Sequence, residues 1–169
     1  MNTDIIAAIA NVSLALSLIV AVIFGISQSK SAARDRKERL TLETLRAFHT
    51  REFAEFIIDI TRHKFPTSQK ELFALPEEQQ AKFIQFAQEM ESIGLLVAEK
   101  YINLELVDKT LGSFVATAWQ KYKPVFEDIR VKSPDPFLGE YFQWLAESID
   151  ARMQNTPRQP YHLQQNRAI

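Results

Sequence analysis

The chain lacks cysteine and holds only four glycines among its 169 residues. The absence of cysteine excludes disulfides, thiolate metal sites and a cysteine nucleophile, and it fits a reducing compartment. The scarcity of glycine, with Val, Ile and Thr residues that rarely alternate with polar ones, favours helices over sheets. Hydrophobic residues make up 46% of the chain and the net charge is −1, so a core can form and the overall charge indicates no class of partner.

The motifs of common enzymes and metal sites are missing as well. The sequence has no Walker loop, no GxGxxG and no GxSxG. Its histidines lie far apart and outside any HExxH motif: His49, His63 and His162. His49 falls on an apolar stripe, which is typical of a packed histidine, and three acidic residues are expected as surface charges: Asp108, Glu127 and Asp128. We therefore expect no enzyme, no metal and no cofactor.

Charge is absent from one long run near the N-terminus. Residues 5–26 read IIAAIANVSLALSLIVAVIFGI. At about 1.5 Å per residue, a helix of this length extends roughly 33 Å, which matches a hydrocarbon core of about 30 Å. A cleaved signal peptide is the alternative, but it requires a basic start and a shorter apolar region, and the preceding MNTD has no base. The sequence predicts a transmembrane helix in a lipid bilayer.

Basic residues gather directly after this run, and we call them the basic collar: Lys30, Arg34, Arg36, Lys37 and Arg39. By the positive-inside rule, the N-terminus lies outside and the rest of the chain lies in the cytoplasm, so a single-pass protein of the cell inner membrane is expected. The collar is expected to lie near anionic headgroups, with each base adding about 1 kcal/mol. Binding of a nucleotide or a nucleic acid is the less favoured alternative.

Small residues follow one face of the apolar run, and we call them the small-residue ridge: Ser13, Ser17, Ala21 and Gly25. Asn11 lies beside the ridge, where its amide needs a partner within hydrocarbon. Small residues let two helices approach closely, so the ridge predicts a homo-oligomer, and its polar members would line any pore. The alternative is a plain anchor in which this pattern arose by chance.

The rest of the chain predicts helices only. No Pro or Gly interrupts residues 31–64, which indicates one long helix. Ser68 and Glu71 form a capping box, and Pro76 starts a helix that reaches about Tyr101. Asn103 caps a helix over 104–132 that Pro124 should kink or divide, and a last helix covers 137–153. The prediction is an all-α protein with a transmembrane helix (1–28), a cytoplasmic helical bundle (29–153, with a long juxtamembrane helix over 29–64) and a flexible tail (154–169).

One block carries a resemblance to a known family. MESIGLLVAEKYINLELVDKTLGSFVATAWQKYKPVFEDIR, residues 90–130, contains Glu91, Gly94, Trp119 and a closing Arg130. In these features, over roughly 48–130, the chain resembles a family of short bacterial proteins classed only as a domain of unknown function. The resemblance implies one N-terminal span followed by a helical domain. From the residue types, we expect these four residues in helix–helix contacts, with Gly94 letting a neighbouring helix come close. We expect Glu91 and Arg130 to form a buried charge pair.

Two functions fit these observations. The first is an oligomeric membrane effector that forms a small ion-conducting pore or perturbs the membrane in a bacterial stress or anti-phage response, gated by its cytoplasmic domain. Comparable small membrane proteins act as such effectors. The second is a membrane-tethered module that recruits a cytoplasmic protein partner. A regulator that binds a nucleotide or nucleic acid at the basic collar is a weaker third candidate.

Overall fold

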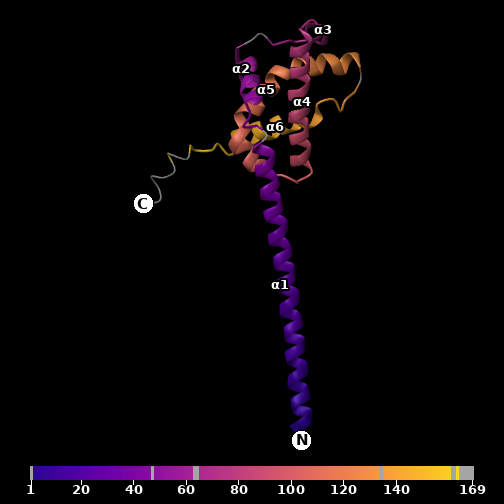
Figure 1. The fold of residues 1–169 in the computed structure, drawn as a ribbon, viewed down its shortest axis with the longest axis vertical. Coiled ribbons are helices and arrows are strands. Elements are labelled where there is room, and N and C mark those ends of the chain that lie inside the picture. The colour runs from indigo at the N-terminus through magenta and orange to yellow at the C-terminus, as the bar shows by residue number, and fades with distance from the viewer. Residues whose placement is uncertain (1, 47, 63–64, 134, 161–162, 164–169) are drawn as a thin grey trace. The chain divides into compact units, whose positions relative to one another are not determined.

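The structure, a computed structural model, describes residues 2–46, 48–62, 65–133, 135–160 and 163. Every regular element within these residues is a helix, which confirms the all-α prediction (Figure 1). The helices are α1 (Asn2–Arg46), α2 (Arg51–Arg62), α3 (Gln69–Phe73), α4 (Glu77–Ala98), α5 (Leu104–Lys132) and α6 (Glu140–Asn155). The chain divides into two compact units, residues 1–39 and 40–169, where the sequence analysis had placed the boundary after residue 28.

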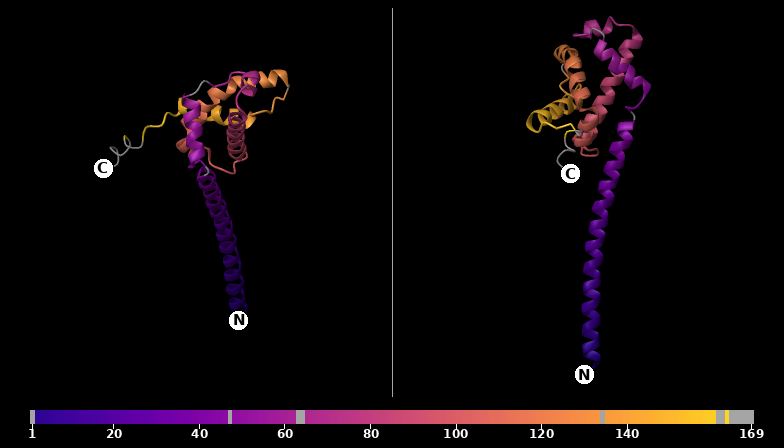
Figure 2. Two further views of the ribbon diagram at one scale, coloured as in Figure 1. Left: turned by 45° about the horizontal axis from the view of Figure 1, so that its top comes forward. Right: turned by 90° about the vertical axis from the view of Figure 1, so that its left-hand side faces the viewer.

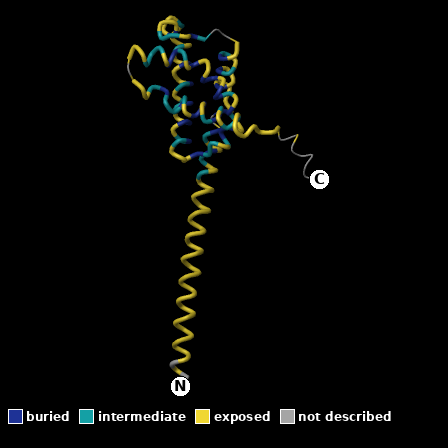
Figure 3. Tube along the Cα trace, turned by 180° about the vertical axis from the view of Figure 1, so that it is seen from behind, coloured by how far each residue is buried: buried dark blue, intermediate teal, exposed yellow. Residues whose placement is uncertain are grey.

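The first unit holds the apolar part of α1. The side chains of residues 5–36 are all exposed, as the unbroken yellow tube in Figure 3 shows. Among the described helices, α1 alone has the length and composition to cross a membrane, and none of its most apolar window is buried. Such a helix is unlike the core helix of a soluble protein, and its place near the N-terminus suits a membrane span or a signal sequence.

The predicted single helix over 31–64 is wrong, because α1 ends at Arg46 and α2 begins at Arg51. The Thr50 hydroxyl accepts a hydrogen bond from the Phe53 amide at 3.2 Å and so caps α2. The turn also lets Phe48 enter the core, where its ring packs edge-on against Phe53 with centroids 5.0 Å apart. Burial of this aromatic ring outweighs the uninterrupted helical propensity of the segment.

In the second unit, α6 packs against both α4 and α5, and α3 packs on α5 (Figures 1 and 2). The core between these helices and α2 is aromatic. Phe86 of α4 is completely buried, and its ring meets those of Phe53, Phe114 and Phe142 at 6.3, 5.7 and 6.0 Å between centroids. Rings from three other helices therefore converge on Phe86, which fixes how the bundle packs.

The predicted helix starts at Ser68 and Asn103 are confirmed. The Ser68 hydroxyl accepts from the Glu71 amide, and the Asn103 side chain accepts from the Glu105 amide at 2.8 Å. The helix after Asn103 covers 104–132 as predicted, but Pro124 does not divide it. Buried residues on both sides of the proline, Tyr122 and Val125, hold the two halves in the core, which compensates for the missing amide donor.

The last helix begins three residues later than the sequence suggested, at Glu140 rather than Phe137. Gly139 precedes it with a φ of 70°, in the left-handed region that glycine adopts without strain. A Cβ at this position would lie 2.4 Å from the Phe126 ring. Phe137 is 69% exposed, because it lies in the turn before α6 and outside the helix.

Candidate functional site

The small-residue ridge lies on α1, and its four members recur every fourth residue along one face. The Ser17 hydroxyl donates to the Ser13 carbonyl at 2.8 Å, so this donor is satisfied within the helix. An added Cβ at Gly25 would meet no atom within 4 Å. Asn11, like the ridge, is exposed. Another helix can therefore pack closely on this face, and the Ser17 hydroxyl does not need that helix as an acceptor for its hydrogen bond.

The basic collar lies further along α1 and is interleaved with acidic residues. The Arg34 guanidinium donates to Glu38 at 2.9 Å, and both side chains are largely exposed. Exposed pairs of this kind contribute little to the stability of a helix. The remaining bases of the collar also belong to α1: Lys30, Arg36, Lys37 and Arg39. Their spread along a single helix favours a solvated or headgroup-facing surface over a concave ligand site.

Glu91 and Arg130 do not form the charge pair expected from the sequence. Glu91 of α4 accepts hydrogen bonds from the amides of Tyr141 and Phe142, at 3.2 and 2.8 Å. Arg130 of α5 instead donates to the Leu138 carbonyl at 2.9 and 2.6 Å. Both side chains therefore bind main-chain atoms at the start of α6, one from each neighbouring helix. A carboxylate is well placed there, because it satisfies free amides and the positive end of the helix dipole.

Gly94 joins the same arrangement, and we call Glu91, Gly94 and Arg130 the α6 clamp. Gly94 is buried, and a Cβ there would lie 2.2 Å from the Tyr141 carbonyl oxygen. Trp119, also singled out from the sequence, is 5% exposed and packs its ring against Phe142 at 5.1 Å between centroids. Glu91, Gly94, Trp119 and Arg130 thus all contact α6 or the residues just before it.

Replacing Glu91 with alanine is expected to lower the free energy of unfolding by about 2 kcal/mol, because two hydrogen bonds from α6 amides to a charged acceptor are lost. Chemical denaturation of the detergent-solubilised full chain measures this change. Glu147→Ala is the control, since that exposed side chain accepts from Gln143 on the same helix. Equal losses in the two variants would contradict the capping role of Glu91.

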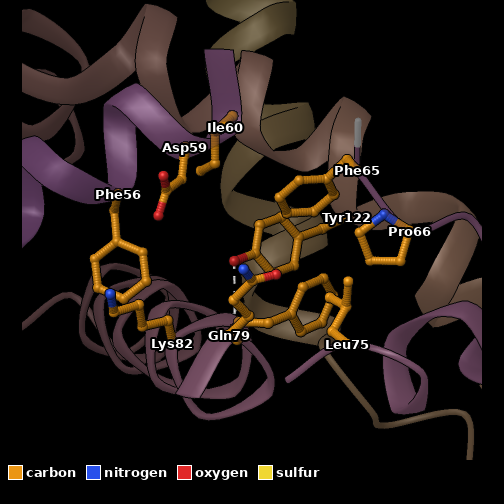
Figure 4. A pocket seen from close by; sticks show the side chains of 10 residues that line it. Phe56, Asp59, Ile60, Phe65, Pro66, Leu75, Gln79, Lys82 and Tyr122 are labelled. Carbon is orange, nitrogen blue, oxygen red and sulfur yellow. Dashed lines mark hydrogen bonds between the residues drawn. The ribbon is translucent and has the colours of Figure 1, made fainter. Parts of the chain in front are cut away.

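A cavity of about 340 Å³ is bounded by α2, α4, α5 and the segment after α2, and Figure 4 shows the side chains that line it. Its wall is mostly apolar, and Asp59 and Lys82 are its charged members. The Tyr122 hydroxyl donates to the Phe83 carbonyl at 3.3 Å. Burial, and secondarily the charge of Glu89, raises the pKa of Tyr122 well above its ordinary value. A phenol kept neutral in this way acts as a hydrogen-bond donor and not as a base. The cavity is therefore better suited to binding an apolar ligand than to catalysing proton transfer.

The structure corrects two further expectations about titratable residues. His49 is exposed in the turn between α1 and α2, and not packed as its sequence position suggested. Asp108, expected at the surface, is only 2% exposed. His63 and His162 lie outside the described residues. Within the part of the chain that is described, no group of three or more His, Cys, Asp or Glu side chains is placed to hold a metal ion.

A second cavity, of about 760 Å³ and not anticipated from the sequence, is formed by α5, α6 and the segment that follows α6. Charged side chains dominate its wall: Glu105, Asp108, Lys109, Arg152 and Arg158. Gly112, one helical turn after Asp108, was the available signal. A Cβ there would lie 2.5 Å from an Asp108 carboxylate oxygen, so the glycine leaves room for a buried acid.

Two further acidic residues named from the sequence lie on α5 away from this cavity. Asp128 accepts hydrogen bonds from Lys132 and from the amide of Gln69. Gln69 is the first residue of α3 and follows the cap residue Ser68. The hydrogen bond from Lys132, followed by that from Gln69, lowers the pKa of Asp128. Glu127 is exposed and pairs with Lys123 at 3.7 Å. Both residues thus have structural partners, and neither lies in a cluster suited to acid–base chemistry.

A sequence model for one family of domains matches residues 7–149, which include most of the apolar run and the helices up to α6. The matched family is described as a domain of unknown function, DUF4760. Neither the curated proteins nor the solved structures contain a match to this chain.

Proposed function

This chain belongs to the DUF4760 family, a domain of unknown function, and we propose that it acts as a membrane-anchored oligomeric effector. In this proposal α1 crosses the bacterial inner membrane once, copies associate through the small-residue ridge, and the helical unit controls what the assembled spans do. The observation that carries the proposal is the exposed apolar stretch of α1, which presents small residues along one face.

Membrane insertion is supported by the length and exposure of the apolar stretch. Residues 5–26 carry no charge and are exposed throughout. In a soluble protein, this large apolar area would be in unfavourable contact with water. The apolar region of a signal peptide extends over only about 7–15 residues, so this stretch suits a permanent span better. The basic collar after it favours a cytoplasmic location for the helical unit and an outside location for the N-terminus.

Self-association is supported by the division of α1 into two faces. The ridge presents side chains no larger than serine, so that the backbones of two copies can approach closely. Leu16, Ile19 and Ile23 lie on the other side, which suits contact with lipid chains. Asn11 beside the ridge gains a hydrogen-bond partner when copies associate, which adds to the driving force within hydrocarbon.

The effector role adds a change in membrane permeability to this assembly. Serines and Asn11 on the associating face would provide a polar lining for a narrow pore without a charged ring. The proposed setting, a bacterial stress or anti-phage response, rests on the likeness to other small membrane effectors. Partners in this proposal are the lipid bilayer and further copies of the same chain.

Exchange of the span tests the proposal. Residues 5–26 are replaced by an unrelated apolar anchor of equal length without small-residue spacing, and both proteins are reconstituted in nanodiscs and in planar bilayers. We expect a defined oligomer and ion conductance for the native chain, and a monomer without conductance for the exchanged one. An exchanged protein that keeps the native mass and current would contradict the proposal, because any anchor would then suffice.

The second candidate function is a membrane-tethered module that recruits a protein partner. It is favoured by an apolar groove of about 380 Å³ on the helical unit, next to Phe73 and Ile84, which are 59% and 46% exposed. Apolar side chains exposed beside a groove are typical of a protein-binding surface. The same span exchange separates the two functions, because a tethered module keeps its activity with a foreign anchor, whereas Phe73→Ser would weaken it.

A further inference from the structure

The charged cavity between α5, α6 and the segment after α6 is built around a buried acid. Asp108 is 2% exposed, and its carboxylate faces two arginines from the C-terminal part of the chain. The Nε atoms of Arg152 and Arg158 lie 3.6 and 3.8 Å from the same carboxylate oxygen. Arg158 also donates to the Asp108 main-chain carbonyl at 3.2 Å. The acid therefore holds both guanidinium groups at the wall of one cavity.

These contacts leave hydrogen-bonding capacity unused. Charge-assisted N–H···O bonds are normally about 2.7–2.9 Å long, so neither arginine makes one with the Asp108 carboxylate. Within the described part of the chain, the Asp108 Oδ1 and the Arg152 Nε have no hydrogen-bond partner although both atoms are buried. Buried polar groups are rarely unsatisfied in proteins. The Arg152 Nε is a donor and can bind an oxygen of an anion, whereas the Asp108 Oδ1 is an acceptor and can bind only a donor such as water.

The balance of charge decides which ligand fits. Lys109 pairs with Glu105 at the rim of the cavity, which leaves one carboxylate, that of Asp108, against two guanidinium groups. The hydrogen bond and charge of Lys109, and then the charges of Arg152 and Arg158, lower the pKa of Glu105. The site thus carries a surplus positive charge. Both arginine side chains are more than two-fifths exposed, so their amino groups are accessible from solvent.

We propose that Arg152 and Arg158 form a binding site for an oxyanion, the phosphate or carboxylate group of a small molecule, and that buried Asp108 positions the two guanidinium groups. Planar guanidinium forks match the oxygen spacing of both groups and bind them with paired hydrogen bonds. The cavity of about 760 Å³ is within the range of small-molecule sites in proteins. This inference concerns the helical unit alone and does not rest on the proposed self-association.

The test measures binding of simple anions to the full chain in detergent. Sodium phosphate and sodium acetate are titrated separately at constant ionic strength, with chloride as the balancing anion, and the midpoint of thermal unfolding is followed. We expect a saturable rise with at least one of the two anions, and the effective one identifies phosphate or carboxylate as the recognised group. General salt effects on stability do not saturate and are the same in every variant.

Two variants and one control locate the binding. Arg152→Gln and Arg158→Gln are each expected to weaken anion binding about tenfold or more, because a charged donor pair is lost. Arg51→Gln is the matched control, since Arg51 is an exposed arginine paired with Glu55 at 2.8 Å on α2. Arg158 follows α6, so its variant remains informative if Arg152→Gln impairs folding. No saturable response to either anion, or an undiminished response in Arg158→Gln, would overturn the proposal.

Discussion

Replacing Ser17 and Gly25 together with leucine is expected to convert the solubilised protein from an oligomer to a monomer. Both positions lie on the small-residue ridge of α1, where no atom of the described residues fills the space beside Gly25. Two leucine side chains would keep neighbouring backbones apart and remove close packing and hydroxyl contacts worth about 3 kcal/mol in total, or roughly a hundredfold in the association constant. Mass measurement in nanodiscs detects this change.

Ala8→Leu with Ala15→Leu is the matched control for this prediction. The two alanines also lie within the apolar run, but at about 180° and 160° around the helix from Ser17. The control adds side chains of the same size to the lipid-facing side, so its oligomer should persist and its insertion should equal that of the ridge variant. If both pairs dissociate the oligomer equally, or neither does, the ridge is not the association surface.

Gly94→Ala is expected to destabilise the helical unit by about 3 kcal/mol or more. The new methyl group would lie 2.2 Å from the Tyr141 carbonyl oxygen and 2.5 Å from its carbon, and these backbone atoms cannot turn aside as a flexible side chain can. Alanine favours the helical state over glycine by about 1 kcal/mol, which is too little to offset the displacement of α6. Equilibrium unfolding in denaturant measures the loss.

Ser92→Ala, two residues earlier on α4, is the control for Gly94→Ala. Ser92 is exposed and its hydroxyl donates to the Gln88 carbonyl of the same helix, so its loss should change the free energy of unfolding by less than about 0.5 kcal/mol. A Gly94→Ala protein as stable as this control would mean that the Tyr141 carbonyl oxygen lies farther than 2.2 Å from a Cβ at position 94. In that case, the α6 clamp would not depend on close approach.

Local signals in the sequence were sufficient for the helices whose starts are capped. The side chains of Ser68 and Asn103 each accept a hydrogen bond from an amide within three residues, and such short-range contacts can be predicted from the local sequence. The whole of α5 followed from its cap and its apolar spacing. The family assignment likewise agrees with the resemblance found in residues 90–130, and the matched region extends over 7–149.

Features that depend on distant residues were not predictable in the same way. The turn at Phe48 forms because an aromatic core of four helices accepts the ring, and no local breaker marks it. Glu91 and Arg130 carry opposite charges, which suggested a pair. Instead, Glu91 binds the amide of Phe142, 51 residues away in sequence, and Arg130 binds the carbonyl of Leu138, 8 residues away. Asp108 looked like a surface charge because Arg152 and Arg158 are remote in the chain.

The α6 clamp acts on main-chain atoms, and this has a consequence for tolerance to mutation. Glu91 accepts from amides, Arg130 donates to a carbonyl, and Gly94 faces the Tyr141 carbonyl, so few of these contacts depend on which side chains α6 carries at its start. Substitutions on the two sides of the contact are therefore unequal. Apart from the buried Phe142 and the left-handed Gly139, residues at the start of α6 can change while the helix keeps its path, whereas a single change at Gly94 on α4 shifts the helix. A mutational scan would record this as permissive positions facing restrictive ones across the same contact.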